Sequence, residues 1–238
     1  DTLPEDARKR YRRCAVLSTC CGCVGEQLID TNSILILYLT TLGAGASLSV
    51  FSTSLSVLAY ALFLIPCAGI SDRLGLKRSA FHACAVAFCA FFLMAVSPAI
   101  LPARYAGYAV IGGCFLYGIT RPLYLSTWYP FLDNFLTNGD RANFFGKMRF
   151  TYMLVNVCAV FLIGRLMGYW AKPPLWLFQI IFAVGGFLQL MRFYYMNKFP
   201  LSPEQLDTTR KKFEIKGPLQ ISCKNTPLVG LSLCLCLM

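Results

Sequence analysis

The chain has 238 residues, of which 57% are hydrophobic and only 14% charged. A soluble domain of this length carries roughly a quarter charged residues, so the composition excludes an ordinary water-soluble protein and predicts a polytopic membrane protein. The net charge of +11 does not indicate nucleic-acid binding, because the basic residues lie between apolar segments and form neither a basic stripe nor a nucleic-acid-binding motif.

Six segments are long and apolar enough to span a bilayer, since a membrane helix needs ~20 mostly apolar residues to cross ~30 Å of hydrocarbon. The sequence therefore predicts an all-α polytopic membrane protein with membrane helices at 14–38, 48–70, 79–97, 105–128, 150–171 and 174–195. A seventh helix is expected to start near residue 227. The expected organisation is an N-terminal segment (1–13), a six-helix transmembrane bundle (14–196), a central loop (197–226) and the start of the seventh helix (227–238).

The Lys and Arg residues are distributed unequally between the connections. Nearly all lie in the N-terminal segment, the second-to-third turn, the fourth-to-fifth loop and the stretch after the sixth helix, where Arg192 is counted. The alternate connections hold only Arg104 and Lys172. Because cytoplasmic loops are enriched in Lys and Arg, we expect a multi-pass protein of the inner (plasma) membrane with its N-terminus and central loop in the cytoplasm.

The turn after the second predicted helix carries a recognisable motif, AGISDRLGLKR, at Ala68–Arg78. It resembles the signature G-x-x-x-D-R-x-G-x-[RK]-[RK] of the major facilitator superfamily, a family of secondary transporters. The leading glycine position is occupied by Ala68, with Gly69 beside it. The residues that match the signature are Asp72, Arg73, Gly75, Lys77 and Arg78, and Gly69 is included with them in the candidate gating motif. Apart from the resemblance, Gly75 permits a tight turn where a side chain would clash.

The resemblance implies a fold, an activity and partners. The six helices would be the N-terminal half of a twelve-helix transporter, built from two inverted three-helix repeats, and the motif would be a cytoplasmic gate between the two halves. Both ends of the sequence look cut, because it begins with Asp and stops within an apolar stretch, so the missing C-terminal half is an expected partner. The other expected partners are the lipid bilayer, a small-molecule substrate and protons.

A second, weaker similarity lies in the fourth-to-fifth loop. Pro130, Arg141 and Gly146 match the P…R[GA]…G pattern of many such transporters, and Arg149 is the last basic residue of this loop. We expect Pro130 to end the fourth helix, because proline removes a backbone donor. The fifth helix lacks the glycine-proline signature of drug/proton antiporters, which argues against multidrug efflux.

Ionisable residues inside the membrane are costly and by default mark a transport pathway or an ion pair. Glu26 and Asp30 are four residues apart and share one face of the first helix. Arg121 lies in the fourth helix, which lines the central cavity together with the first helix in the family fold. We expect Glu26 and Arg121 to form a polar site in which Arg121 holds an anionic group of a solute and Glu26 or Asp30 takes a proton. Arg165 is an alternative partner for Asp30.

Further pathway residues are expected beside this pair: the aromatic residues on the face of Arg121, and one amide in the fifth helix. These residues are Tyr117, Tyr124, Trp128 and Asn156. A structural alternative is that the intramembrane charges form a salt bridge that only locks helix packing. Small, polar residues on one side of the second helix favour close packing over substrate contact; these residues are Ser47, Ser49, Ser52, Thr53 and Ser56.

Catalytic and metal-binding patterns are not found. Most of the twelve cysteines lie in apolar segments, where cysteine acts as a small hydrophobic residue, and His82 is the only histidine. No Ser-His pair, Cys-His pair or metal cluster can be assembled, so the sequence predicts neither an enzyme nor a cofactor. The leading prediction is a transporter of a small polar organic solute that works by alternating access. The alternative is a self-contained six- or seven-span protein, such as a homo-oligomeric channel or scaffold.

Overall fold

The computed structural model describes residues 4–30, 32–137 and 139–201, and the predicted central loop and seventh helix lie almost entirely outside this part of the chain. The described residues form helices and no strands. In chain order the helices are α1 (Glu5–Asp30), α2 (Asn32–Thr41), α3 (Ala46–Leu74), α4 (Leu76–Ile100), α5 (Ala103–Asp133), α6 (Arg141–Gly168) and α7 (Leu175–Met196). The predicted all-α class is therefore confirmed.

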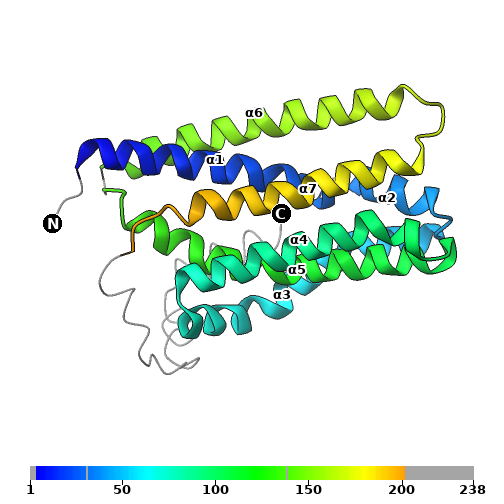
Figure 1. Cartoon of the computed structure of the whole chain (residues 1–238), viewed down its shortest axis with the longest axis horizontal. Helices are drawn as coiled ribbons and strands as arrows, with labels where there is room; N and C mark the ends of the chain where they lie inside the picture. Colours follow the sequence, from blue (N-terminus) through cyan, green and yellow to red (C-terminus); the bar gives the residue numbers. More distant parts are fainter. Residues whose placement is uncertain (1–3, 31, 138, 202–238) are drawn as a thin grey trace, which may run out of the picture.

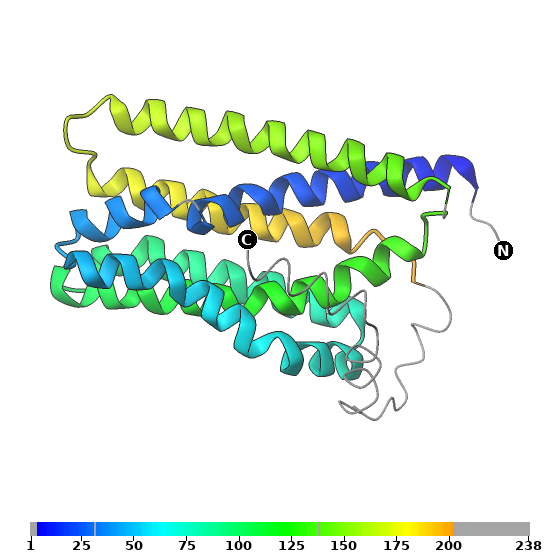
Figure 2. The same cartoon turned by 180° about the vertical axis from the view of Figure 1, so that it is seen from behind.

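The long helices run up and down along one axis, as Figures 1 and 2 show from opposite sides. Four of them, α1, α7, α4 and α5, pack in sequence around the centre of the bundle, with α1 against α7, α7 against α4 and α4 against α5. Helix α3 packs on the outside of α5, and α6 packs on the outside of α1. The first repeat consists of α1 with α2, α3 and α4, and the second of α5, α6 and α7. The middle helix of each repeat thus packs against the first helix of the other repeat, as expected for two inverted repeats.

Most of the predicted helices agree with the structure in type and differ at their ends. The predicted first helix, 14–38, corresponds to α1 and α2, which together begin earlier and end later than predicted. The predicted fifth helix, 150–171, begins earlier, at Arg141. The prediction that Pro130 ends the fourth helix is wrong, because α5 continues to Asp133. The extra turn buries Phe131 against Phe199, with ring centroids 5.6 Å apart, and this packing outweighs the hydrogen bond that proline removes.

Among the described helices, α3, α4, α6 and α7 are each long and apolar enough to cross a membrane by length and composition. The remaining helices, α1 with α2 and α5, correspond to the predicted first and fourth membrane helices. They carry intramembrane charges, and they are covered from outside by α6 and α3, respectively. Polar residues are tolerated on these helices because their polar faces turn toward the interior of the bundle.

Small side chains bring α3 and α5 close together, as the serine pattern of the second predicted helix indicated. Ser49, Ser52 and Ser56 are buried on α3, whereas Ser47 is exposed and Thr53 is partly buried. On α5, a Cβ atom added at Gly118 would lie only 2.5 Å from the backbone carbonyl oxygen of Ser56. The two backbones therefore touch at Gly118, as small residues permit at membrane-helix interfaces.

Replacing Gly118 with alanine is expected to destabilise the protein by about 1–3 kcal/mol, because the added methyl group meets backbone that cannot move without separating the two helices. The matched control is Gly164→Ala on α6, where an added Cβ has nothing within 4 Å. We expect thermal unfolding in detergent to show a lower midpoint for Gly118→Ala and no loss for Gly164→Ala. Equal midpoints for the two variants would contradict close contact between α3 and α5.

Candidate functional site

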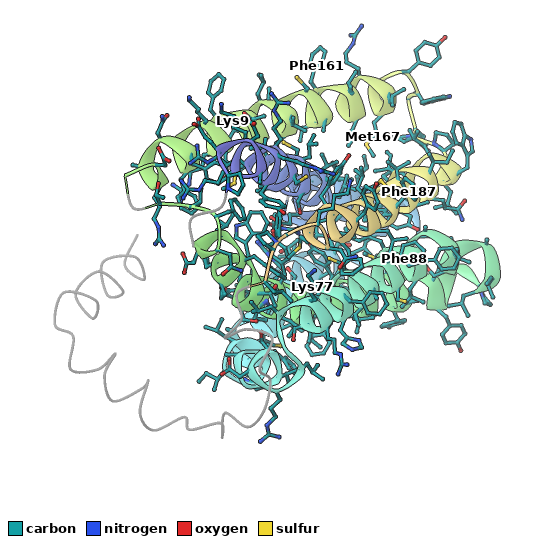
Figure 3. The ribbon with its side chains drawn as sticks, turned by 60° about the vertical axis from the view of Figure 1, so that its left-hand side comes forward. Lys9, Lys77, Phe88, Phe161, Met167 and Phe187 are labelled. Atoms are coloured by element: carbon teal, nitrogen blue, oxygen red, sulfur yellow. The ribbon has the colours of Figure 1, made fainter. Side chains whose placement is uncertain are left out.

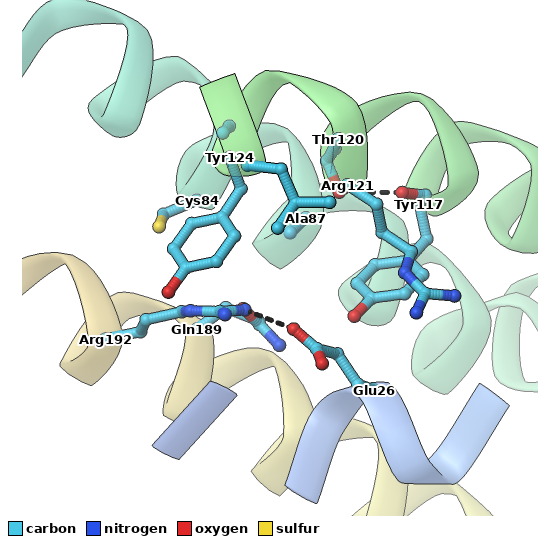
Figure 4. A pocket seen from close by; sticks show the side chains of 11 residues that line it. Glu26, Cys84, Ala87, Tyr117, Thr120, Arg121, Tyr124, Gln189 and Arg192 are labelled. Carbon is cyan, nitrogen blue, oxygen red and sulfur yellow. Dashed lines mark hydrogen bonds and ion pairs between the residues drawn. The ribbon is translucent and has the colours of Figure 1, made fainter. Parts of the chain in front are cut away.

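A polar cluster lies at the centre of the four inner helices, where an apolar bundle would otherwise be closed by hydrocarbon side chains (Figure 4). It surrounds a small cavity of about 60 Å³, which has room for a few water molecules but not for an organic solute. The polar or charged residues of the lining are Glu26 from α1, Cys84 from α4, Tyr117, Thr120, Arg121 and Tyr124 from α5, and Gln189 and Arg192 from α7.

The deepest charge of the cluster is Arg192, which is only 5% exposed. Its Nη1 donates a hydrogen bond of 2.8 Å to Oε1 of Glu26, and its guanidinium carbon lies 3.4 Å from the centroid of the Tyr124 ring. Figure 4 shows the guanidinium between the Tyr124 hydroxyl and the Glu26 carboxylate. A buried arginine needs such partners, because an unpaired charge would be expensive to keep away from water.

Two glycines of α1 make room for the polar side chains of α7. A Cβ atom at Gly22 would lie 2.2 Å from Cζ of Arg192, and one at Gly25 would lie 2.4 Å from Nε2 of Gln189. Ser18, on the same side of α1, donates a hydrogen bond of 3.1 Å to the backbone carbonyl of Arg192. The small face of α1 therefore sets the depth at which the Glu26–Arg192 pair forms.

The second ion pair joins α1 to α5. Nη1 of Arg121 lies 2.9 Å from Oδ1 of Asp30, and the two side chains are 28% and 38% exposed, respectively. The guanidinium also lies 5.9 Å from the ring centroid of Tyr60 on α3. Asp30 and Arg121 line an open cleft of about 830 Å³, whose other lining residues come from α3 between Phe51 and Ala61. This pair, unlike Glu26–Arg192, is in reach of molecules that enter the cleft.

The predicted pairings are therefore corrected by the structure. Glu26 does not pair with Arg121, because its carboxylate is paired with Arg192 of α7, which lines the same small cavity. Asp30 pairs with Arg121 and not with Arg165, which lies exposed on α6. One helical turn separates the two carboxylates, so each meets a different neighbouring helix.

The expected aromatic residues occupy different places. Tyr117 and Tyr124 line the small cavity, and the hydroxyl of Tyr117 is buried without a hydrogen-bond partner among the described residues. Trp128 lies outside both cavities, stacked on Tyr124 and packed against Phe199. Asn156 lies between α6 and α1, where its Nδ2 is 3.4 Å from Oε1 of Gln27.

Arg192 is the functional candidate that the sequence analysis missed. It was counted with the cytoplasmic loop although it lies within the apolar segment 174–195. Gln189 and Arg192 are three residues apart and therefore share a face of α7. Two polar residues at this spacing in an apolar helix were the available signal, because such residues turn toward the interior of a bundle.

The motif at the α3–α4 connection has the predicted tight turn. Gly75 alone separates the two helices and adopts φ +80° and ψ 158°, a conformation essentially restricted to glycine. Lys77 donates a hydrogen bond of 3.2 Å to the backbone carbonyl of Asn197, just after α7. Gly69 is buried in α3, whereas Asp72, Arg73 and Arg78 are exposed.

The fourth-to-fifth loop is held at the same end of the bundle by ion pairs. Arg141 Nη2 lies 2.7 Å from Oδ1 of Asp133 at the end of α5, and Arg12 of α1 pairs with Asp140. Hydrogen bonds from Thr137 and Arg12 lower the pKa of Asp140 below its usual value. The other two predicted loop residues, Gly146 and Arg149, are exposed on α6.

Among the described residues, no group of three or more His, Cys, Asp or Glu side chains is placed to hold a metal ion.

Comparisons with known proteins agree with the motif. No curated protein and no solved structure matches the chain. The family model of the Major Facilitator Superfamily matches residues 15–238, nearly the whole sequence. The chain therefore belongs to the major facilitator superfamily, and is a multi-pass membrane transport protein and not an enzyme.

Proposed function

We propose that the protein is a proton-coupled secondary transporter that moves a small polar organic solute across the plasma membrane by alternating access. The observation that carries the proposal is the Asp30–Arg121 pair, which lies in the wall of an open cleft large enough for an organic solute. Binding sites of transporters of this kind lie near the bilayer midplane, between helices that carry rare intramembrane charges.

Arg121 is the proposed anchor for an anionic or strongly polar group of the solute. A guanidinium offers several donors in a fixed plane and binds carboxylate or phosphate oxygens through two parallel hydrogen bonds. Asp30 accepts a hydrogen bond of 2.9 Å from Nη1 of Arg121. The solute must therefore compete with Asp30 for Arg121.

Protonation of Asp30 is the proposed coupling step. When Asp30 takes a proton it loses its charge, and its attraction to Arg121 weakens, so the guanidinium becomes available to the solute. The exposure of Asp30 to the cleft supports this role, because a proton must be able to reach the carboxylate. Glu26 is the less suitable acid, since its partner Arg192 is buried in the core of the bundle.

Alternating access and orientation are also proposed here. We place the N-terminus and the α3–α4 turn in the cytoplasm, where Asp72, Arg73 and Arg78 are exposed and free to contact a second helical bundle at the gate. A C-terminal half of the same protein is the proposed second bundle. Large apolar side chains exposed on the flanking helices, such as Leu62 on α3 and Phe161 on α6, are available for that contact and for lipid.

The test is uptake of a panel of radiolabelled sugars, amino acids and organic acids into cells that express the complete protein, at two pH values. We expect at least one solute to accumulate faster at the lower pH. Arg121→Ala is expected to abolish this uptake while the protein remains inserted in the membrane. The matched control is Arg165→Ala, which removes an exposed intramembrane arginine that lines neither cavity. Unchanged uptake by Arg121→Ala would refute the proposed site.

A further inference from the structure

A groove of about 630 Å³ lies between the N-terminal parts of α1 and α6, at the end of the bundle where both helices begin. Figure 3 labels Lys9 on the α1 side of this region. The groove is separate from the polar cluster and from the cleft, with which it shares no lining residue. The charged residues of its lining are Lys9, Arg12, Arg13, Asp140 and Lys147.

The charges of the groove do not balance. Arg12 is paired with Asp140, and Lys9 is paired with Glu5 at 3.1 Å. Arg13 and Lys147 are both exposed and form no ion pair with any residue that the structure describes. The groove therefore presents two cations, one from each helix, without a protein counter-charge, and it is complementary to an anion.

The wall of the groove on α1 becomes apolar one turn further along the helix, and the surface of α6 beyond the groove also carries exposed apolar side chains. Val16 and Leu17 line it on α1, and Leu17 is 45% exposed. On α6, the residues after Lys147 include Phe150 and Leu154, which are 72% and 54% exposed. A free inorganic anion gains nothing from this apolar surface, whereas an amphiphile with an anionic head and hydrocarbon chains is complementary to both parts.

We propose that the groove binds an anionic phospholipid. The lipid phosphate lies between Arg13 and Lys147, and an acyl chain follows Leu17 and the exposed apolar side of α6. Basic pockets between membrane helices are known to bind anionic lipid head groups, and each Lys or Arg near the surface contributes about 1 kcal/mol. The binding depends only on the position of these helices in a bilayer and not on the transported solute.

The lipid has a structural consequence for α6. This helix packs mainly against α1 and exposes most of its apolar surface. A phosphate that contacts Arg13 of α1 and Lys147 of α6 at once connects the two helices at their common end. Anionic lipid is therefore expected to stabilise the folded protein by holding α6 on the bundle.

The test compares the complete purified protein in nanodiscs of phosphatidylcholine alone and in nanodiscs that also contain phosphatidylglycerol. We expect phosphatidylglycerol to raise the thermal unfolding midpoint and to remain bound in native mass spectrometry. The double variant Arg13→Gln/Lys147→Gln should bind phosphatidylglycerol about thirtyfold more weakly. The matched control is Arg10→Gln/Arg149→Gln, which removes two exposed cations from the same helices outside the groove and should bind as the wild type does.

Three outcomes would overturn the proposal. The first is equal retention of phosphatidylglycerol by the groove variant and the control variant. The second is stabilisation by phosphatidylcholine that equals stabilisation by phosphatidylglycerol. The third is an equal midpoint shift with inorganic phosphate alone, which would indicate a free-anion site. Should the double variant fail to fold in phosphatidylcholine, Arg13→Gln alone decides, with binding expected to be about fivefold weaker.

Discussion

Replacing Arg192 with methionine is expected to destabilise the folded protein by about 2–3 kcal/mol, because it breaks an ion pair whose arginine is buried and leaves Glu26, which is 30% exposed, without its partner. Arg192 is 5% exposed and is the ion-pair partner of Glu26. It also covers the ring of Tyr124, so the variant loses packing as well as charge. Unfolding of the purified protein in mixed detergent micelles, followed by circular dichroism, measures the loss.

The matched variant removes both charges at once. Glu26→Leu/Arg192→Met replaces the pair by apolar side chains, and such replacements of a buried pair are often neutral or stabilising. We expect the double variant to recover most of the lost stability and to retain measurable transport, because in our proposal Glu26 and Arg192 hold α1 to α7 and the solute binds at Arg121. If the double variant is stable but transports nothing at either pH, then Glu26 belongs to the transport pathway and its assignment as a lock is wrong.

Much of the fold could be predicted from the sequence because hydrocarbon imposes a simple rule on composition. Any segment that crosses it must be apolar for about 20 residues, so α3, α4 and α7 are visible as apolar runs. The turn at Gly75 was also predictable, since only glycine adopts its conformation without strain. The ends of helices outside the membrane, such as the start of α6 at Arg141, follow no such rule, because water can form hydrogen bonds with the backbone of a loop as well as with the end of a helix.

The pairings of the charges could not be predicted, although the charges themselves were identified. The arginine that pairs with Glu26 depends on how closely α7 packs against α1. This close packing is possible because Gly22 and Gly25 have no Cβ atom. The rotation of α5 then leaves Arg121 opposite Asp30, one turn further along α1. The distance between two helices and their relative rotation depend on both partners, so they cannot be predicted from the periodicity of one helix.

We propose that the Glu26–Arg192 pair stabilises helix packing and that the Asp30–Arg121 pair binds the solute. A substitution at Asp30 tests this assignment directly. Replacing Asp30 with asparagine removes the negative charge that occupies Arg121 and mimics the protonated acid. The variant should bind solute without taking up a proton. We therefore expect it to lose accumulation driven by a pH gradient, while exchange of internal for external solute continues.

The measurement uses the complete protein in proteoliposomes with the solute identified in the uptake panel. Accumulation under an imposed pH gradient should be lost in Asp30→Asn, with equal solute concentrations on the two sides, since a transporter without its coupling acid can only equilibrate the solute. Counterflow should persist at neutral pH. Glu26→Gln is the matched control, because it makes the same change one helical turn away at the other ion pair. It should lower stability but keep accumulation dependent on the pH gradient. The reverse result, with accumulation lost in Glu26→Gln and kept in Asp30→Asn, would transfer the coupling role to Glu26, because only the acid that exchanges the proton can link the gradient to movement of the solute.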